Sequence, residues 1–524
     1  MRIAAMDLGS NSFHLLVADA HPDGSFEPLA RDKEMLRLGS VVARTGALGE
    51  DAAAASVETV ARFKALASSL GADEIVACAT SALREARDSL AVVDRIEDET
   101  GVKVRVISGK DEARLIFDAV RTSVVIDPGP ALAMDLGGGS LELMVGDSGG
   151  LAWSASLKLG VARLTAELVR GDPPTGADRR RVVDAVTSRI NHPLLPRISG
   201  VGATVAIGSS GTLRTLIALC AAQGGGPLPA SVNQLSVKLD DLESLQKDIL
   251  SMTSSERAGL PGVEARRADL LPAGVLVATT VMKLAGVDTL VGCEWALREG
   301  MVLDAIRHHS RAEWDPDPKA MRRESVLNLC RRSEFNEVHA RKVARIAIDL
   351  FDGTASLHRL AEHERDLLEF AALLHDIGEY VSKDGHERHT AYLIENGRLR
   401  GFSPHEVAVM SCLGRFHKRG TPKSSFETYA RFSPEERKTV NKLVALLQVA
   451  DGLDRSHGGP VRDVSVTTRP GVVEVTVDAD EDIDLEVWGL RRKRELFERV
   501  FDCKLEVTES RRAPVGTVDL TCPR

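Results

Sequence analysis

Two short segments of the sequence combine an aspartate, glycines and serines directly after an apolar run. The first is Met6-Asp7-Leu8-Gly9-Ser10-Asn11-Ser12 and the second is Met134-Asp135-Leu136-Gly137-Gly138-Gly139-Ser140. Glycine lets backbone N–H groups approach an anion without obstruction by a Cβ atom, so a glycine-rich turn after a strand can bind phosphate oxygens. Two such turns could hold one phosphate chain. The candidate phosphate ligands are Gly9, Ser10, Asn11, Ser12, Gly137, Gly138, Gly139 and Ser140.

Asp7 and Asp135 end the two apolar runs. A carboxylate beside a polyanion is unfavourable unless a cation or its bound waters lie between the two, so this pair predicts Mg²⁺, held directly or through water. A single Asp-x-Gly segment is more often an Asx-capped hairpin turn. The matched pair favours the phosphate interpretation.

The repeat also predicts how the chain is organised. Residues 1–125 alternate short apolar runs with helical periods, as in Ile75 to Ala79 followed by a helix start near Ser81. A turn at Asp127-Pro128-Gly129-Pro130 then precedes a second strand, Ala131 to Met134. We therefore expect two duplicated α/β domains, 1–125 and 126–309. Their loops would face each other across a cleft at the strand ends, where open α/β sheets commonly bind ligands.

A different pattern follows these two domains. Asp315-Pro316-Asp317-Pro318 cannot continue a helix, because proline lacks an N–H donor and restricts the residue before it. We place a linker there. Residues 320–456 are almost wholly helical in pattern, as in Leu367 to Leu374, whereas Val464 to Val477 alternates like a strand. The sequence thus predicts an all-α domain at 320–456 and a small α+β cap at 460–524.

Composition limits the classes of function. The chain has 524 residues and a formal net charge of −9, which argues against a general nucleic-acid-binding protein. No apolar run is expected to reach the roughly 20 residues of a membrane span, and the N-terminus is too short in apolar residues for a signal peptide. Seven cysteines are scattered without a CxxC pair, which indicates the reducing cytoplasm. A polyanionic substrate would need a locally basic channel, for which the candidates are Lys33, Arg37, Arg84, Arg87, Lys110, Lys158 and Arg163.

The two loop segments resemble the phosphate loops of the exopolyphosphatase and guanosine pentaphosphate phosphohydrolase family. Further segments match that family in order: Ala79 to Arg84, Ile107 to Ala113, Gly208-Ser209-Ser210-Gly211-Thr212, Arg267 to Gly274, and Leu297 to Gly300. The resemblance covers residues 1–305 and continues more loosely through the helical region. It implies a pair of actin-like ATPase (ribonuclease H-like) domains and a Mg²⁺-assisted phosphohydrolase.

The resemblance also implies roles for individual residues. Glu112 would be the catalytic base, although Asp111 stands where the family has a glutamate. Glu142 would orient water or hold Mg²⁺ together with Asp135, and Arg84 would pair with phosphate. Ser209, Gly211 and Thr212 would add phosphate contacts. Read without the resemblance, Glu112 is more simply part of a solvated helix start.

The helical region has its own candidate metal ligands. His339, the pair His375-Asp376, and Asp451 occur in the order of the ligands of HD-domain phosphohydrolases, which this region resembles. Imidazole and carboxylate groups on facing helices can hold a divalent metal. His386, His389 and His417 could extend the cluster toward a second ion. Two interpretations stay open: a second activity, such as hydrolysis of a nucleotide phosphate, or a retained structural metal.

The leading hypothesis is a cytoplasmic exopolyphosphatase that releases orthophosphate from inorganic polyphosphate. The nearest alternative removes the 5′-terminal phosphate of guanosine pentaphosphate with the same loops. An actin-like sugar kinase or ATPase, or a non-catalytic alarmone sensor, would share the loops but would not release orthophosphate without ATP. The expected assembly is a homodimer, since two-fold dimers are the commonest oligomers.

Overall fold

The computed structural model describes residues 1–21, 25–191, 194–223, 225–309, 317–479 and 482–510. The chain forms two compact units, Met1–Met321 and Arg322–Arg524. Much of the expected linker, including Asp315 and Pro316, lies outside the described residues.

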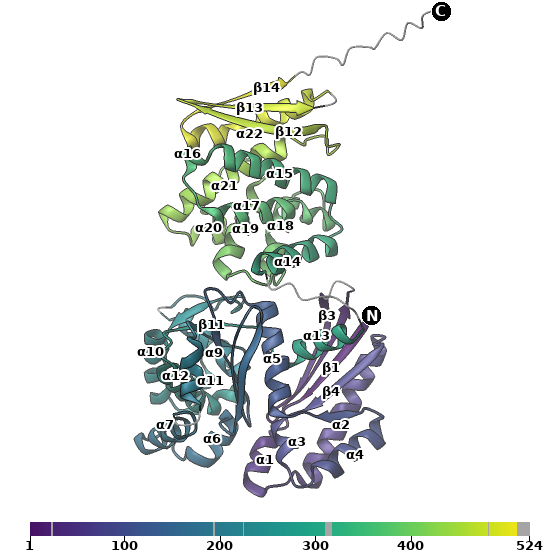
Figure 1. Ribbon diagram of the computed structural model, residues 1–524, viewed down its shortest axis with the longest axis vertical. Helices are drawn as coiled ribbons and strands as arrows, with labels where there is room; N and C mark the ends of the chain where they lie inside the picture. The colour runs from purple at the N-terminus through teal and green to yellow at the C-terminus, as the bar shows by residue number, and fades with distance from the viewer. Residues whose placement is uncertain (22–24, 192–193, 224, 310–316, 480–481, 511–524) are drawn as a thin grey trace, which may run out of the picture. The chain divides into compact units, whose positions relative to one another are not determined.

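The first unit contains two mixed sheets with the same core topology (Figure 1). The first sheet has the order β3-β2-β1-β4-β5. Its strands are β1 (Arg2–Leu8), β2 (Phe13–Ala20), β3 (Phe26–Glu34), β4 (Glu74–Ala79) and β5 (Val104–Val106). β1 pairs antiparallel with β2 and parallel with β4. The strand expected at Ile75 to Ala79 is therefore confirmed as β4.

The second sheet repeats this plan and adds one edge strand. Its order is β10-β11-β9-β6-β7-β8, in which β6 pairs antiparallel with β7 and parallel with β9. Its strands are β6 (Ala131–Leu136), β7 (Leu141–Asp147), β8 (Gly150–Leu157), β9 (Val205–Gly208), β10 (Ser236–Lys238) and β11 (Thr289–Gly292). The common order supports the duplication expected from the two loop segments, with β6 in the position of β1.

Alternation along β1 and β6 builds separate cores on the two faces of each sheet. Ala4, Met6 and Leu8 join the outer core of the first sheet. Ile3 and Ala5 point to the opposite face, into a core that also receives Ala131 and Ala133 of β6. Because side chains alternate between the faces of a strand, Asp7 and Asp135 belong to the faces that share this inner core.

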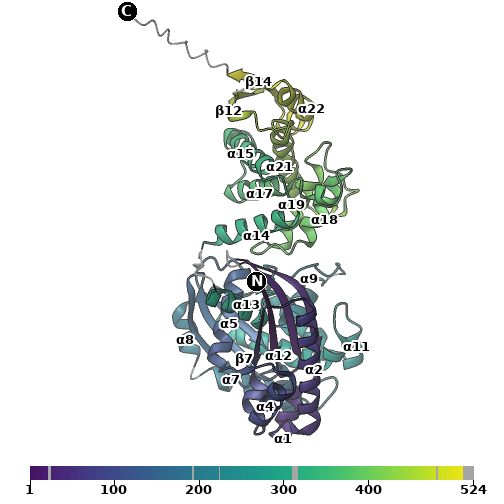
Figure 2. The same ribbon diagram turned by 90° about the vertical axis from the view of Figure 1, so that its right-hand side faces the viewer.

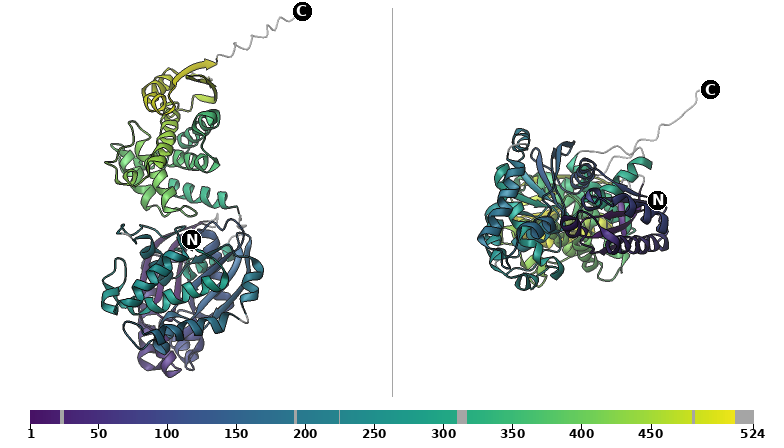
Figure 3. Two further views of the ribbon diagram at one scale, coloured as in Figure 1. Left: turned by 90° about the vertical axis from the view of Figure 1, so that its left-hand side faces the viewer. Right: turned by 90° about the horizontal axis from the view of Figure 1, so that it is seen from below.

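Helices cover the outer face of each sheet. The first sheet carries α1 (Leu38–Thr45), α2 (Gly49–Ser69), α3 (Ser81–Glu85) and α4 (Ser89–Thr100). The outer side of the second lobe contains α6 (Val161–Leu168), α7 (Gly176–Ile190), α8 (Leu195–Val201), α9 (Gly211–Ala221), α10 (Leu239–Ser251), α11 (Ser254–Ala258), η1 (Ala265–Leu270) and α12 (Leu271–Ala285). In the left-hand view of Figure 3, blue-green and teal helices of this lobe face the viewer.

Two further helices, α5 (Gly109–Ser123) and α13 (Leu297–His309), share the inner core between the sheets. Each follows the last parallel strand of one lobe and packs on the sheet of the other: α5 contacts β7 and β8, whereas α13 contacts β1 and β2. The expected second domain, 126–309, therefore includes a helix that covers the first sheet. Sequence periodicity identifies a buried helix but does not say which sheet it covers.

The second unit begins with a helical bundle (Figure 2). Its helices are α14 (Pro318–Arg332), α15 (Glu337–Gly353), α16 (Ala355–His358), α17 (Glu362–Leu374), η2 (Ile377–Tyr380), α18 (His386–Asn396), α19 (Pro404–Phe416), α20 (Glu427–Ala430) and α21 (Pro434–Gly452), with the start of α14 preceding the unit boundary. The almost wholly helical pattern predicted for 320–456 is confirmed, and the last of these helices ends at Gly452.

A three-stranded sheet and one helix follow in the described part of this unit. They are β12 (Val461–Arg469), β13 (Val472–Ala479), α22 (Asp484–Phe501) and β14 (Lys504–Ser510). The run expected as strand at Val464 to Val477 is a hairpin, because Pro470 and Gly471, the latter with φ 74°, turn the chain. Val475 and Phe497 share one apolar core with the helical bundle, so the expected cap and bundle form one packed body.

The expectation that no apolar run is long enough to span a membrane is wrong for Ala265–Ala285. This helical segment of 21 residues contains an 18-residue window with a mean hydropathy of 1.5. Of that window, 78% is buried within the protein, where α12 contributes Val275, Val277 and Val281 to the core of the second lobe. Its apolar character is accounted for by that packing.

Candidate functional site

A cleft of about 740 Å³ opens in the first unit, where the loops after β1 and β6 meet. It brings together most of the residues that the sequence singled out. These are Asp7, Gly9, Ser10, Asn11, Ser12, Glu112, Asp135, Gly137, Gly138, Gly139, Ser140, Glu142, Ser209, Gly211 and Thr212. The two lobes therefore present their loops to one space.

Four of the carboxyl groups that line the cleft come from different elements of the two lobes. Asp7 and Asp135 occupy equivalent positions near the ends of β1 and β6, and Glu142 of β7 lies opposite Asp135 in the antiparallel register. Glu112 enters from the first turn of α5, whose N-cap Ser108 accepts a hydrogen bond from the Asp111 N–H. The fold thus converges on a strongly acidic centre.

Burial dominates the titration of these acids. It raises the pKa of Asp7 to about 7, and neighbouring Glu112 and Asp135 add to the shift. Burial likewise raises the pKa of Asp135, and raises that of Glu142 well above its ordinary value with help from Glu112. Acids that repel one another in a buried site favour a bound cation.

Glu112 is 6% exposed and has one strong partner. Arg84 Nη1 donates a hydrogen bond to Glu112 Oε2 at 2.9 Å and another to the Ile107 carbonyl at 2.8 Å. Burial raises the pKa of Glu112 to about 7, against the lowering effect of the Arg84 charge. Arg84, which the resemblance assigned to phosphate, therefore lies beside the candidate base and is not among the residues lining the cleft.

The two glycine loops touch each other. A Cβ atom on Gly138 would lie 2.8 Å from Asn11 Cβ, and one on Gly139 would lie 2.6 Å from Ser10 Oγ and 2.7 Å from Ser81 Oγ. Only glycine fits such approaches without movement of the neighbouring loop. The glycines of the second segment thus set the spacing between the lobes.

Several hydroxyl groups of the predicted site already have protein partners. Ser209 Oγ donates to Asp135 Oδ2 at 2.7 Å, and Ser10 Oγ accepts from the Ala82 N–H at 2.9 Å. Ser12 Oγ lies 2.8 Å from His14 Nε2. These hydroxyls therefore hold the loops and Asp135 in place.

The cleft also carries a group of cations that sequence reasoning mostly missed. Of the basic candidates it named for the channel, Lys33 lines the cleft and pairs with Glu264 at 2.8 Å. The other cationic lining residues are Arg31, Arg214, Arg266, Arg267 and Arg298. Arg214 stands two residues after Thr212, and Arg267 and Arg298 belong to segments that carried the family resemblance, so the motifs contained a signal.

Other basic candidates are engaged elsewhere. Arg37 pairs with Asp269, and Arg87 donates to the Thr45 carbonyl. Lys158 and Arg163 both pair with Glu85. The residues that line the cleft do not include Arg37, Arg87, Lys110, Lys158 or Arg163.

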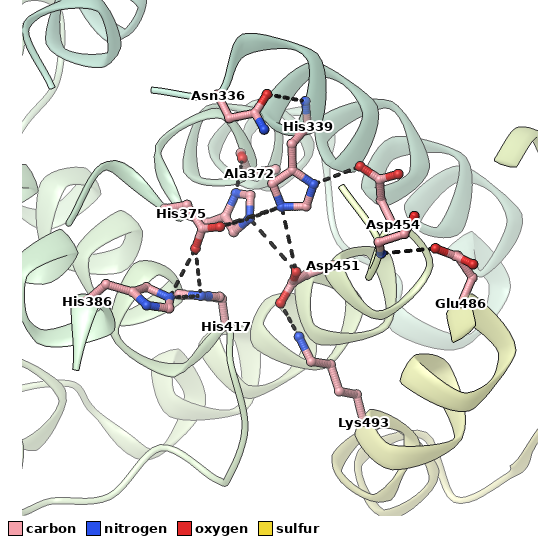
Figure 4. Close-up of polar contacts among 12 residues, drawn as sticks. Asn336, His339, Ala372, His375, His386, His417, Asp451, Asp454, Glu486 and Lys493 are labelled. Carbon is pink, nitrogen blue, oxygen red and sulfur yellow. Dashed lines mark hydrogen bonds and ion pairs between the residues drawn. The ribbon is translucent and has the colours of Figure 1, made fainter. Parts of the chain in front are cut away.

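The second unit brings the four predicted metal ligands of the helical region together. His339 Nε2 lies 3.1 Å from His375 Nε2 and 3.5 Å from Asp376 Oδ2. Asp451 Oδ1 is 3.9 Å from His339 Nε2 and 4.0 Å from His375 Nε2. Burial lowers the pKa of His375 to about 4, whereas in His339 the hydrogen bonds with Asp376 and Asp454 outweigh burial and raise the pKa to about 9. Figure 4 shows the cluster.

The duplicated lobes and the paired glycine loops over acidic and basic groups define a two-lobed α/β protein with a phosphate-type site. Comparison with known proteins specifies the class. The sequence model of the Ppx/GppA phosphatase family matches residues 16–309, and the model described as Ppx/GppA phosphatase, domain III, matches residues 321–487. The chain belongs to the Ppx/GppA phosphatase family.

Individual relatives agree with this placement. Exopolyphosphatase 1 of Mycobacterium leprae is 38% identical over 306 residues, which cover 58% of this chain and 89% of that protein. Exopolyphosphatase 1 of Mycobacterium tuberculosis is 37% identical over the same length, with 58% and 88% covered. The crystal structure of an exopolyphosphatase from Cytophaga hutchinsonii has a TM-score of 0.55 and 28% identity and covers 59% of this chain and 98% of its own. The Aquifex aeolicus Ppx/GppA member has a TM-score of 0.51 and 27% identity, with the same coverage.

Proposed function

We propose that this protein is an exopolyphosphatase that releases orthophosphate from the end of inorganic polyphosphate. The observation that carries the proposal is the placement of Glu112, a buried acid with a pKa near 7, in a cleft lined by two facing glycine loops. Family membership and the relatives named exopolyphosphatase support it. The equal strand order of the two sheets supports the actin-like interpretation of the fold.

The chain supplies three functions to this reaction. The loops and the lining arginines bind the phosphate chain, since backbone N–H groups and guanidinium groups both suit phosphate oxygens. Glu112 accepts a proton from a water molecule as that water attacks the terminal phosphorus, and the bond to the bridging oxygen breaks. Arg84 positions the Glu112 carboxylate. The products are orthophosphate and a polyphosphate one unit shorter.

Asp7, Asp135 and Glu142 form the proposed Mg²⁺ site. Carboxylate oxygens are the ligands that Mg²⁺ prefers, and the mutually raised pKa values of these acids indicate a site that a cation would stabilise. Among the described residues, the groups whose ligand atoms lie within 4.8 Å of one another are in the second unit and do not include the acids of the cleft. The wider separation of Asp7, Asp135 and Glu142 supports a Mg²⁺ ion that they hold partly through water. Bound Mg²⁺ would neutralise charge on the phosphate oxygens.

Guanosine pentaphosphate is the second candidate substrate, since its 5′-terminal phosphate needs the same loops. A guanine base is commonly held by stacking on an aromatic ring. None of the described residues that line the cleft is Phe, Tyr or Trp. This lining supports a substrate without a base.

The test is orthophosphate release with Mg²⁺ from long-chain polyphosphate and from guanosine pentaphosphate, with no ATP added. We expect faster release from polyphosphate and a loss of about 10²- to 10⁴-fold in kcat for Glu112→Gln, the range for removal of a general base. Asp111→Asn is the matched control, because Asp111 is the adjacent acid but is exposed. Equal activity of the two variants would contradict the role of Glu112. Faster orthophosphate release from guanosine pentaphosphate would make that nucleotide, and not polyphosphate, the preferred substrate.

Three expectations from the sequence remain proposals. The six described cysteines are free thiols, which supports a cytoplasmic location. The homodimer is to be tested by light scattering of the purified chain. The HD-type interpretation of the helical region rests on its buried histidines.

A further inference from the structure

The two helices that cross between the lobes each carry a buried glutamate in the first turn. Glu112 is the fourth residue of α5, and Glu299 is the third residue of α13. The two helices occupy equivalent places in the duplicated plan, since each follows the last parallel strand of its lobe and packs on the other sheet. Figure 1 shows α13 beside β1 of the first sheet. The second lobe therefore has its own counterpart of the candidate base.

The two glutamates differ in what they can reach. Glu112 lines the cleft, whereas Glu299 is fully buried and is not among the described residues that line it. Leu297 and Met301 anchor the start of α13 in the inner core between the sheets. A carboxylate held there cannot touch a substrate in the cleft. Any effect of Glu299 on the reaction must therefore act through its neighbours.

One oxygen of Glu299 has a local partner. Glu299 Oε2 accepts a hydrogen bond from the Ala296 N–H at 3.0 Å, just before the helix begins. A glutamate at the third position of a helix commonly caps the first turn in this way, and a glutamine can do the same. This capping contact accounts for Oε2 and leaves Oε1 to be explained.

The other oxygen of Glu299 faces two guanidinium groups. Glu299 Oε1 lies 3.5 Å from Arg31 Nη2 and 4.0 Å from Arg298 Nη2. Within the described part of the chain, this buried oxygen accepts no hydrogen bond. Burying a carboxylate is costly unless an opposite charge lies close, and here two cations from separate elements supply that charge. Glu299 thus holds an arginine of β3 and an arginine of α13 near one point.

Both of these arginines form part of the wall of the cleft. The charge of Arg298 also reaches the acidic centre, because burial raises the pKa of Asp7 to about 7 and Arg298 opposes that rise. The planar fork of an arginine binds phosphate best when it is already oriented, since less side-chain entropy is then lost for each hydrogen bond. A buried carboxylate behind Arg31 and Arg298 can supply this orientation.

We propose that Glu299 is a positioning residue that orients Arg31 and Arg298 to bind phosphate oxygens of the substrate. The inference rests on the proposed function of the cleft, because it assigns a task in the same reaction to a further residue. It also gives the two crossing helices different tasks. The acid of α5 meets the attacking water, whereas the acid of α13 holds the cations that bind the phosphate chain.

The test compares Glu299→Gln, which keeps the helix cap and removes the charge, with Glu299→Asp, which keeps the charge and shortens the reach. Each should raise KM for polyphosphate about tenfold or more and leave kcat within about twofold, since binding is weakened and Glu112 is untouched. Loss of a negative charge alone would strengthen the binding of a polyanion, so a lower KM in Glu299→Gln would overturn the proposal. Asp304→Asn is the matched control, because Asp304 lies on α13 and pairs with Arg114 at 3.0 Å. It should match the wild type, and an equal rise in KM there would also overturn the proposal.

Equilibrium binding separates positioning from a general loss of structure. The probe is linear tripolyphosphate, titrated calorimetrically into the Glu112→Gln protein, in which hydrolysis is slow. Adding Glu299→Gln should weaken binding about tenfold or more, but by less than about twofold once Arg31→Gln and Arg298→Gln are also present, because nothing is then left to position. An equal loss in both backgrounds would overturn the proposal. Unchanged binding in Arg31→Gln or in Arg298→Gln alone would overturn it whether or not the Glu299 variants fold.

The same measurements distinguish this inference from the proposed function. If the wild type releases no orthophosphate from polyphosphate and binds no tripolyphosphate, the proposed function fails and the inference fails with it. If the wild type does both and Glu299→Gln matches it, the role of Glu299 is wrong while the proposed function stands.

Discussion

Arg84 Nη1 lies 2.9 Å from Glu112 Oε2 and 2.8 Å from the carbonyl oxygen of Ile107, just before the turn into α5. The guanidinium therefore links the candidate base to the backbone of the preceding segment. It holds the carboxylate in one orientation and lowers its pKa, while burial raises that pKa. Together the two effects place the pKa of Glu112 at about 7, which suits a general base that works near neutral pH.

This pair predicts a change in the pH profile. Glu112 acts as a base only when deprotonated, so kcat/KM should fall as pH drops below about 7. Removing the cation in Arg84→Gln raises the Glu112 pKa, so the acid limb should move to higher pH by about 1 unit or more. Arg87→Gln is the control, since Arg87 bonds to the Thr45 carbonyl. If the acid limb of the kcat/KM profile stays at the same pH in Arg84→Gln, the group that controls this limb is not Glu112.

The contact between the loops predicts an effect of one methyl group. In Gly139→Ala the new Cβ would lie 2.6 Å from Ser10 Oγ, so the loops must separate. Overpacking of this kind costs roughly 1 to 3 kcal/mol, and we expect about a tenfold or greater loss of polyphosphatase activity with the fold retained. Gly200→Ala, where a Cβ meets nothing within 4 Å, should retain full activity. Steady-state kinetics and circular dichroism measure the two properties, and an active Gly139→Ala enzyme would contradict the tight contact.

The lining cations predict the salt dependence of binding. Arg267 Nη2 donates to Thr212 Oγ1 at 3.2 Å at the edge of the second lobe's phosphate loop. Arg267 also lines the cleft, where its guanidinium can donate to a phosphate oxygen of the substrate. Losing such a hydrogen bond costs about 1.5 to 3 kcal/mol, so KM for polyphosphate should rise about tenfold or more in Arg267→Gln. The rise in KM with added salt should become less steep. Arg180→Gln, an exposed substitution on α7, should match the wild type; a similar rise there would indicate a general charge effect.

The capping box of α7 predicts a pH-dependent contribution to stability. Asp178 accepts hydrogen bonds from the backbone N–H groups of Thr175 and Gly171, and its pKa is lowered to about 2. A lowered carboxyl pKa contributes stability that is present above the unfolded pKa near 4 and is lost as pH falls toward 2. The melting temperature of Asp178→Asn should thus lie below the wild type at pH 7, and the gap should narrow below pH 4. Asp184→Asn, which changes an exposed acid of the same helix, should show no such gap.

Local sequence predicted the parts of this site that depend on backbone chemistry. The glycine segments, the aspartates at the strand ends and the duplication all follow from residue type and order. The cations Arg214, Arg267 and Arg298 were not assigned, because a charge in a sequence does not show whether it faces a cleft or solvent. His386 and His417 were named only as extensions of a cluster. Their pairing with Asp376 depends on how four helices pack, which helical periodicity does not specify.

The exchange of α5 and α13 between the lobes has a consequence for the order in which the protein can form. During synthesis the first sheet is complete by residue 106, but the helix that covers the inner faces of β1 and β2 ends only at His309. Ile3, Ala5 and Leu16 on that face stay uncovered while about two hundred further residues are made. A nascent chain that ends before His309 should therefore expose an apolar surface to chaperones. For the same reason, neither lobe should fold when it is expressed alone.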